Sequence, residues 1–294
     1  IINPKITLSI TFPGAKYEIR AAEDVITPDG TRRAAKGELV DTVTTDIDGL
    51  AKSKELYLGN YGVKEIEAPY GMVLNDKVHT ALLVYAGQNV SVTETGTSFV
   101  NDRQKVEISL EKTMETSKLF GIGENGEVKN VSFGIYAADE LVSTSGTSIP
   151  KDGLIEVINP DEKGKATFKT DLPFGSYYVK EIATDNHYIL SDKQYPVVFE
   201  YAGQDNAVVK LAVNDGKPID NDLKYGSVSG IKVDENGNGL GGAIIGLFKT
   251  NDGKFTTDNA ILTTTSNDDG SFSFADIPYG TRKTTVIVRC GSQN

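Results

Sequence analysis

A twelve-residue frame occurs twice in this chain, and its spacing sets the size of the folding unit. The first copy runs from Asn101 to Lys112 (NDRQKVEISLEK) and the second from Asn221 to Lys232 (NDLKYGSVSGIK). Both copies begin with Asn-Asp and place Ser at the ninth position and Lys at the twelfth. They lie 120 residues apart, which is the length of an ordinary domain. The chain is therefore predicted to consist of repeated modules.

A second set of landmarks divides the chain into three modules. Each module has an acidic turn that ends in Gly, then a strand-like stretch and a second Gly; the pairs are Gly49 and Gly59, Gly164 and Gly175, and Gly270 and Gly280. Glycine at such turns permits a positive φ. We expect two complete modules, module 1 (1–103) and module 2 (104–222), and an incomplete module 3 (223–294).

Between these landmarks the hydrophobic pattern has the two-residue period of β-strands. Lys165-Ala-Thr-Phe-Lys-Thr and Gly270-Ser-Phe-Ser-Phe-Ala are examples, and such runs are bounded by Gly, Asp, Asn or Pro. A helical pattern is weak and confined to 51–58 and parts of 20–38. Many short strands with regular turn signals predict an all-β fold of tandem immunoglobulin-like β-sandwich modules.

Composition excludes several classes of function. The 30 Lys and Arg against 41 Asp and Glu give a net charge of −11, without the basic cluster that nucleic acid or an anionic membrane requires. The longest apolar run, 81–86 (ALLVYA), is too short to span a membrane. We expect no metal and no cofactor, since the two His and the single Cys show no ligand spacing. The chain starts at Ile1 without a signal peptide, and we interpret it as part of a longer protein.

One acidic turn needs separate mention because it resembles half of a calcium loop. The segment 234–239 (DENGNG) fits the first positions of an EF-hand. The twelfth position is Ile245 instead of the Glu that binds calcium there, and no flanking helices are evident. We therefore predict a hairpin turn.

Two segments carry a more specific motif. Tyr61-Gly-Val-Lys-Glu65-Ile-Glu-Ala-Pro69-Tyr-Gly71 and Tyr177-Tyr-Val-Lys-Glu181-Ile-Ala-Thr resemble the E-box of the Cna protein B-type, or SpaA-type, prealbumin-like domains of Gram-positive surface adhesins and pilins. The resemblance covers essentially the whole chain, although the second copy departs from the motif after Thr184. It implies an extracellular protein of the Gram-positive cell wall.

In that family a first-strand Lys and a last-strand Asn form a spontaneous isopeptide bond, assisted by the E-box Glu. For module 2 the resemblance implies Lys112 as the nucleophile, Glu181 as the proton shuttle and Asn221 as the electrophile. The reaction occurs once per molecule, so it is not an enzyme activity. The bond would close a loop of 109 residues, which by analogy with a disulfide is worth on the order of 4–5 kcal/mol.

These residue types suit the reaction for physical reasons. Burial can lower the pKa of a Lys amine from about 10.4 to roughly 5–6, which leaves the amine free to attack. A buried Glu has a raised pKa and can shuttle protons. The alternative interpretation takes Lys112 and Glu181 as solvent-facing strand charges and Asn221 as a turn residue.

The other modules match the pattern less well. In module 1 the resemblance implies Glu65 and Asn101, with Lys5 as the only lysine near the expected position. In module 3 Lys232 is present, but Val286 stands where the other modules have Glu, six residues after the second Gly. We expect Lys232 to stay unpaired, and we interpret 282–294 as a foreign or divergent end.

Three functions stay open. The leading hypothesis is a structural stalk that projects a domain binding host extracellular matrix or a glycan, with sortase anchoring to peptidoglycan; both lie outside this sequence. One alternative is that a module itself binds a host or carbohydrate ligand. The other is that the modules are accessory β-domains of a secreted polysaccharide-degrading enzyme.

Overall fold

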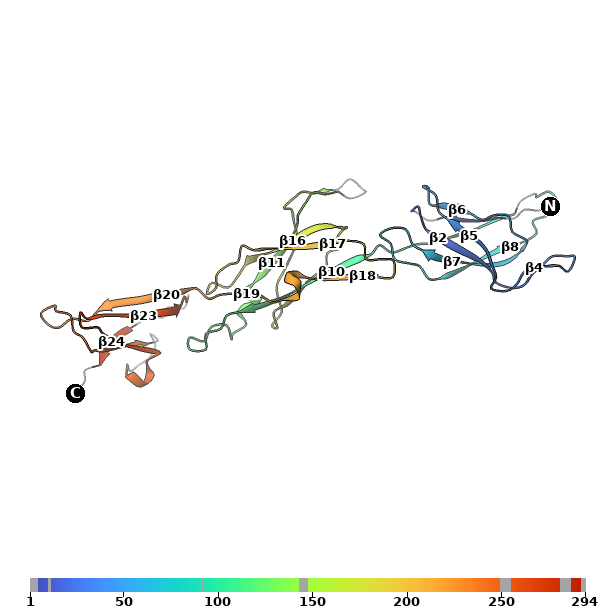
Figure 1. Ribbon diagram of the computed structural model, residues 1–294. Helices are drawn as coiled ribbons and strands as arrows, with labels where there is room; N and C mark the ends of the chain where they lie inside the picture. Colours follow the sequence, from blue (N-terminus) through green and yellow to red (C-terminus); the bar gives the residue numbers. More distant parts are fainter. Residues whose placement is uncertain are drawn as a thin grey trace. The chain divides into compact units, whose positions relative to one another are not determined.

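The protein is built from short β-strands joined by turns, as Figure 1 shows. This computed structural model describes residues 5–9, 12–90, 93–142, 148–248, 255–280 and 287–291. In this part of the chain the helices are the short 3-10 helices η1 (Glu127–Asn130), η2 (Val213–Gly216) and η3 (Thr257–Asn259). The all-β prediction is confirmed. The weak helical signals at 20–38 and 51–58 were wrong, because these segments form strands and turns.

The chain divides into two compact units. Unit 1 comprises Ile1–Glu107, Asp171–Phe174 and Phe199–Lys210, and unit 2 comprises Ile108–Thr170, Gly175–Val198 and Leu211–Asn294. Unit 1 therefore contains module 1 together with residues 104–107 and two further short segments that belong in sequence to module 2. Unit 2 contains the rest of module 2 and module 3.

Module 1 is a sandwich of two sheets. One sheet has the order β6-β1-β9, with β6 (Leu50–Lys52), β1 (Lys5–Ser9) and β9 (Glu94–Ser98). The other has the order β5-β2-β7-β8, with β5 (Leu39–Thr44), β2 (Lys16–Ala21), β7 (Gly59–Glu67) and β8 (Val78–Leu83), while β3 (Val25–Ile26) and β4 (Arg32–Ala34) pair separately. Alternate residues of β2 point into the core, namely Tyr17, Ile19 and Ala21, as the two-residue period predicts.

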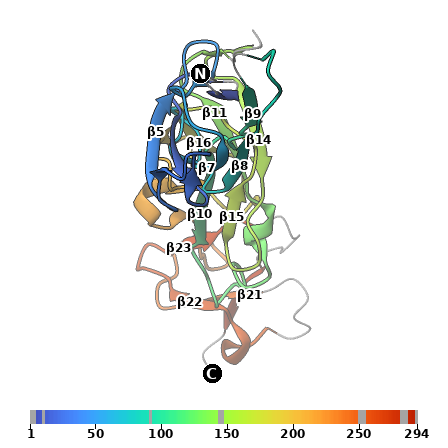
Figure 2. The same cartoon turned by 90° about the vertical axis from the view of Figure 1, so that its right-hand side faces the viewer.

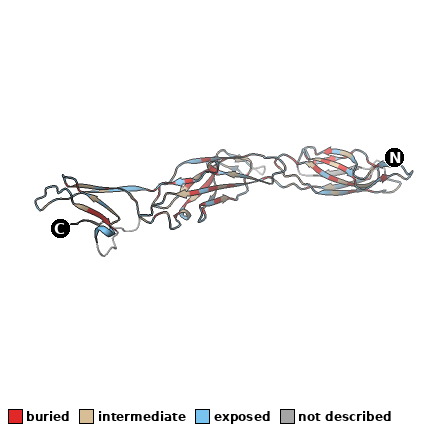
Figure 3. Ribbon diagram, turned by 60° about the horizontal axis from the view of Figure 1, so that its bottom comes forward, coloured by how far each residue is buried: buried red, intermediate tan, exposed pale blue. Residues whose placement is uncertain are grey.

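Module 2 repeats this arrangement. Its first sheet has the order β15-β10-β18, with β15 (Lys165–Phe168), β10 (Lys105–Met114) and β18 (Val208–Ala212), and β19 (Ile219–Asn221) also pairs with β10. Its second sheet has the order β14-β11-β16-β17, with β14 (Leu154–Ile158), β11 (Ser132–Ala137), β16 (Gly175–Ala183) and β17 (Gln194–Phe199). The pair β12 (Leu141–Val142) and β13 (Ser148–Ile149) stands apart from both. Buried residues lie on strands of both sheets, for example Ile108 on β10 and Ile135 on β11, as expected for a core between them. Figure 3 marks the buried positions along the ribbon.

Module 3 has the same order of strands as far as the structure describes it. The first strand β20 (Tyr225–Ile231) pairs with β23 (Ser271–Pro278), and β21 (Ile244–Phe248) pairs with β22 (Leu262–Thr265) and β24 (Ile287–Gly291). The predicted hairpin turn at 234–239 is confirmed. Val233 and Gly239 form a bridge, and Asp234 Oδ1 accepts hydrogen bonds from the N–H groups of Asn236 and Asn238.

The first strand of a module lies parallel to its last strand. β1 pairs with β9 in parallel in module 1, and β10 pairs with β19 in parallel in module 2. Parallel neighbours cannot be joined by a tight hairpin, so the chain between them must cross over. Here the crossover is the rest of the module, and β10 can be followed beside β15 in Figure 2. This topology brings the two ends of a module to adjacent positions.

Candidate functional site

The structure buries the three residues that the sequence singles out in module 2. Lys112 lies on β10, Glu181 on β16 and Asn221 on β19. Their exposed fractions are 2%, 1% and 2%. Charged residues are rarely buried this fully unless they are paired or reactive. The alternative of solvent-facing charges is therefore wrong for Lys112 and Glu181.

The backbone fixes Lys112 next to the last strand. In the parallel register Lys112 lies opposite Ile219 and Met114 lies opposite Asn221. The Nζ atom of Lys112 donates hydrogen bonds to the main-chain oxygens of Ile219, at 2.9 Å, and Thr113. The amine therefore reaches across to β19 two residues before Asn221.

Glycine at the acidic turn allows the chain to approach this lysine closely. The N–H of Lys112 donates to the carbonyl oxygen of Gly164 at 2.7 Å. Gly164 has a φ of +78°, and a Cβ atom there would lie 2.0 Å from the carbonyl oxygen of Lys112. Only glycine fits both conditions. The repeated Gly of the sequence thus holds the strand that carries Lys112.

Glu181 and Asn221 contact each other directly. The Nδ2 atom of Asn221 donates hydrogen bonds to Glu181 Oε1 at 2.6 Å and to Thr184 Oγ1 at 2.9 Å. Glu181 Oε2 and Asn221 Oδ1 are buried and have no hydrogen-bond donor among the described residues. A proton on the carboxyl group would supply one such donor, because a protonated Glu has an O–H.

Burial shifts both titratable groups towards their uncharged forms. It lowers the pKa of Lys112 to about 8, against the opposing effect of the Glu181, Asp220 and Asp222 charges. It also raises the pKa of Glu181, against the opposing effects of the hydrogen bond from Asn221 and the charge of Lys112. A neutral amine beside a neutral carboxyl group is the state required for attack on an amide.

Module 1 has a different arrangement around the equivalent Glu65. Its carboxylate accepts hydrogen bonds from Tyr17 Oη at 3.1 Å, from the N–H of Asn75 at 2.7 Å and from Asn101 Nδ2 at 2.6 Å. Tyr17 pairs with Glu65 as Phe133 pairs with Glu181. The Tyr17 hydroxyl is therefore an additional donor that module 2 lacks. The structure thus brings together Glu65 and Asn101, as predicted.

The strand register does not bring Lys5 to this pair. Lys5 lies opposite Glu94, seven residues before Asn101, whereas Lys112 lies opposite a residue only two before Asn221. The difference of five residues is about 16 Å along a strand, which is further than a Lys side chain reaches. The prediction of Lys5 as the module 1 nucleophile therefore does not fit this register.

Two pairings agree on which position corresponds to Lys112. Ser9 lies opposite Leu50, which follows the Gly of the acidic turn, as Glu111 lies opposite Lys165. Ser9 also lies opposite Ser98, three residues before the module's Asn. The residue after Ser9 therefore corresponds to Lys112. In the sequence it is Ile10, which lies outside the described residues.

Module 3 has the lysine but no equivalent of the Glu. The N–H of Lys232 donates to the oxygen of Gly270, and its Nζ donates to the oxygen of Val233, as Lys112 donates to Gly164 and Thr113. The predicted position of the missing Glu needs correction. Val286 lies outside the described residues, and the register places Cys290 opposite Ile245, which corresponds to Phe133. The position equivalent to Glu lies ten residues after Gly280 in this register, whereas Glu65 and Glu181 lie six residues after Gly59 and Gly175.

Sequence reasoning missed two polar partners of the site. Thr184 accepts from Asn221 in module 2, and Tyr17 donates to the carboxylate in module 1. A signal for Thr184 was present, since it follows the E-box Glu by three residues. No sequence signal marked Tyr17, because an aromatic residue at a core position of a strand looks like ordinary packing.

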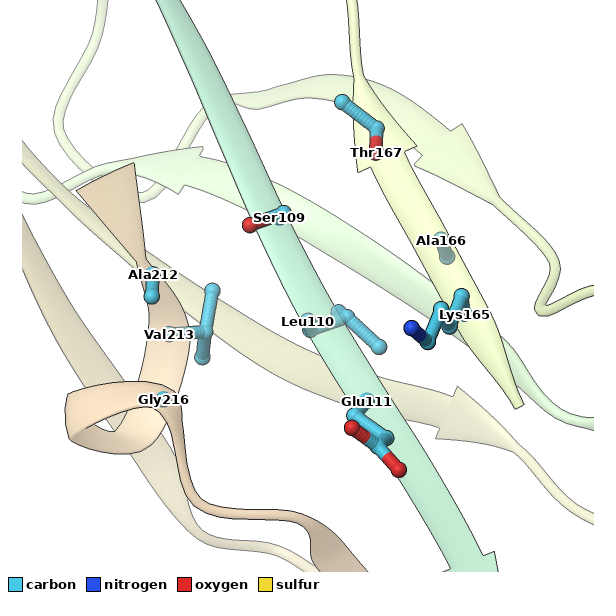
Figure 4. Close-up of a pocket in the computed structure, with 9 residues that line it drawn as sticks. All are labelled: Ser109, Leu110, Glu111, Lys165, Ala166, Thr167, Ala212, Val213 and Gly216. Atoms are coloured by element: carbon cyan, nitrogen blue, oxygen red, sulfur yellow. The ribbon is translucent and has the colours of Figure 1, made fainter. Parts of the chain in front are cut away.

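The pocket of module 2 lies apart from the buried Lys112, Glu181 and Asn221. It has a volume of about 230 Å³ and lies on the β10–β15 surface. Its lining residues, drawn in Figure 4, are Ser109, Leu110, Glu111, Lys165, Ala166, Thr167, Ala212, Val213 and Gly216. None of Lys112, Glu181 and Asn221 lines it. In the described ranges no group of three or more His, Cys, Asp or Glu side chains is placed to hold a metal. The same ranges contain no helix with the length and apolar character of a membrane span.

Repeated two-sheet sandwiches with parallel first and last strands define a class of protein, namely tandem prealbumin-like modules. The chain belongs to the SpaA family of prealbumin-like fold domains. The family matches residues 9–98, 118–217 and 226–285, and each match lies inside one of the three expected modules. The predicted resemblance is confirmed.

Several relatives share parts of this chain. The trypsin-resistant surface T6 protein of Streptococcus pyogenes serotype M6 is 26% identical over 140 residues, which are 46% of this chain and 25% of that protein. The Bacillus anthracis TIE protein has a solved structure with a TM-score of 0.58 and 22% identity, over 94% of this chain and 43% of that one. The structure of the streptococcal ancillary pilin is 16% identical, with a TM-score of 0.31, over 99% of this chain and 96% of that chain. The chain therefore spans less than half of the surface T6 protein and of the TIE protein.

Proposed function

We propose that this chain is part of the stalk of a Gram-positive cell-surface protein, and that a Lys112–Asn221 isopeptide bond stabilises module 2. The joint burial of Lys112, Glu181 and Asn221 carries the proposal. A buried lysine without an ion pair is costly unless it has a chemical use. The family and the streptococcal surface relative support an extracellular location at the cell wall.

The reaction exchanges one amide for another. The neutral Nζ atom of Lys112 attacks the Cγ atom of Asn221, and the Cγ–Nδ2 bond breaks. Glu181, protonated at the start, delivers its proton to the departing nitrogen, which leaves as ammonia, and takes a proton back from the attacking amine. Glu181 ends in its starting state, and no oxidant or co-reactant is needed. Fixed proximity in the folded core supplies the rate enhancement.

A stalk function also requires parts that this sequence does not contain. In the proposal, binding of a host matrix protein or glycan belongs to another domain, and sortase anchoring to peptidoglycan belongs to another segment. The small share of the surface T6 protein and of the TIE protein that this chain covers is consistent with both.

The intact mass of the purified chain tests the cross-link. We expect the mass to fall short of the sequence mass by one ammonia molecule, and we expect Lys112→Ala to restore the full mass. Peptide mapping should find residue 112 joined to residue 221. A full sequence mass for the unchanged, folded chain would overturn the proposal.

A further inference from the structure

A loop of unit 1 seals the end of the module 1 E-box. The loop follows β17 and contains Gln204, whose side chain bonds the main chain at two points. The N–H of Ala68 donates to Gln204 Oε1 at 2.8 Å, and Gln204 Nε2 donates to the oxygen of Ile66 at 3.3 Å. The N–H of Leu74 donates to the main-chain oxygen of Gln204 at 3.0 Å. One glutamine thus satisfies main-chain groups on both sides of the E-box turn.

Aromatic rings surround this contact. The Tyr201 ring lies 4.9 Å from the Tyr70 ring, centroid to centroid, and its hydroxyl donates to the oxygen of Met72 at 3.2 Å. The Phe174 ring lies 6.2 Å from both tyrosine rings. Gly71 is needed here, because a Cβ atom would lie 3.0 Å from the Phe174 ring. Tyr70 and Gly71 of the E-box therefore form the surface against which Tyr201 and Phe174 pack.

The loop is held in shape by Gln104, which is fully buried. Its Nε2 atom donates to the oxygens of Gly203, at 2.9 Å, and Asn206, at 2.7 Å, and its Oε1 accepts from the N–H of Ala202 at 2.9 Å. Gln104 belongs to the twelve-residue frame, so the frame also orders the loop.

The same loop sequence occurs in module 1. Tyr85-Ala-Gly87-Gln88-Asn follows β8, as Tyr201-Ala-Gly203-Gln204-Asp follows β17, and both strands lie at the same edge of their sheets. The turns match in backbone: Val90 N–H donates to the oxygen of Gly87 at 3.3 Å, and Asn206 N–H donates to that of Gly203 at 3.3 Å. Both glycines have positive φ, +108° and +91°.

The module 1 copy differs in that its two contact residues face solvent. Tyr85 is 57% exposed, and Gln88 is exposed as well. We propose that the segment 85–89, the module 1 docking loop, binds the E-box end of another B-type module. It would do so in the same way as the module 2 loop 201–205 contacts the segment 66–74. The turn is already formed, so docking would lose little conformational entropy. The expected partner is a B-type module, because the matching loop of module 2 contacts the E-box end of such a module. The inference rests on the tandem arrangement of modules and not on the isopeptide bond.

An extended chain tests this proposal by giving the module 1 docking loop a partner. Residues 1–111 are fused to the front of residues 10–294, so that Glu111 is followed by Ile10. Because Glu111 corresponds to Ser9 in the strand pairing, the native connection 101–111 now leads into the second copy of module 1. The first copy of residues 1–111 carries Glu67→Asp, an exposed position, so that its peptides differ in mass from those of the second copy. Hydrogen exchange is then measured on peptides that contain Ala68 and Leu74.

We expect both copies of these amides to exchange slowly. Gln88→Ala in the second copy of module 1 should speed exchange of the first-copy amides by on the order of tenfold. The reason is that this change removes only the contact between that docking loop and the first E-box. Gln204→Ala is the matched control, and it should speed exchange only in the second copy. The proposal is overturned if Gln88→Ala leaves the first copy unchanged, whether or not Gln204→Ala acts on the second. The loss of one ammonia from the intact mass of the same sample reports separately on the Lys112–Asn221 bond of the proposed function.

Discussion

Glu65 and Glu181 occupy equivalent places in two modules, but their partners differ. Glu65 receives three hydrogen bonds, one of them from the Tyr17 hydroxyl. Glu181 receives one from Asn221, lies within reach of Thr184 and Ser191, and is affected by the charge of the buried Lys112. Burial raises the pKa of Glu181 even though hydrogen bonds from Asn221, Thr184 and Ser191 and the charge of Lys112 act in the opposite direction. Because the module 1 position that corresponds to Lys112 is Ile10, we expect proton transfer from an attacking lysine in module 2 alone.

This difference predicts opposite effects of one substitution. Glu181→Gln should abolish the loss of ammonia, because an amide keeps the hydrogen-bonding shape but cannot shuttle the proton. Glu65→Gln is the matched control and should leave the mass of the chain unchanged. Intact-mass measurement of both variants checks this. A change in mass with Glu65→Gln would show that module 1 also forms a bond.

The rate of bond formation should depend on pH through Lys112. Burial lowers the pKa of Lys112 to about 8, and only the neutral amine attacks. Acidification through that pKa protonates the amine, so the rate should fall about tenfold per pH unit below 8. The measurement is the time course of mass loss after newly made chain is moved from pH 6 to a series of higher values. A rate that stays constant from pH 6 to pH 8 would contradict this assignment.

At the scale of strands, the sequence predicted the elements better than their register. Alternation and repeated glycines were sufficient for the sandwich; the repeated frame marked Lys112 and Asn221, and the E-box resemblance marked Glu181. The module 1 lysine was misplaced because a strand-like run, 6–10, contains no signal for which residue meets the last strand. Register is decided by long-range pairing, which sequence spacing alone does not specify.

The close approach at Gly164 predicts a large effect of adding one methyl group. Gly164→Ala places a Cβ atom 2.0 Å from the Lys112 carbonyl oxygen in addition to the strain at positive φ. Gly126→Ala is the matched control in the same module, since its φ is +81° and nothing lies within 4 Å of the added atom. We expect about 1–3 kcal/mol of destabilisation for the control and clearly more for Gly164→Ala. Urea unfolding of module 2, with Glu181→Gln present in every chain to remove the bond, measures the difference; equal midpoints would refute the steric argument.

At the scale of the molecule, the connection between modules 1 and 2 also carries one end of the proposed bond. The frame that begins at Asn101 and ends at Lys112 contains the end of one module, the Gln104 that orders the docked loop, and the lysine of the next module. A pulling force along the chain would enter module 2 at its first strand and leave at its last. With Lys112 joined to Asn221, that force bypasses every strand between them.

This path predicts how the whole chain extends under force. The 108 residues between Lys112 and Asn221 should stay folded when the chain is pulled from its ends, because the covalent bond carries the load. In Glu181→Gln the same residues should unfold and add up to about 390 Å of length at ~3.6 Å per residue. Single-molecule force spectroscopy checks this, and the unfolding step of module 1 serves as the internal control in both chains. A step of that length in the unchanged chain would mean that the load passes through the sheets of module 2 and that no bond joins its first strand to its last.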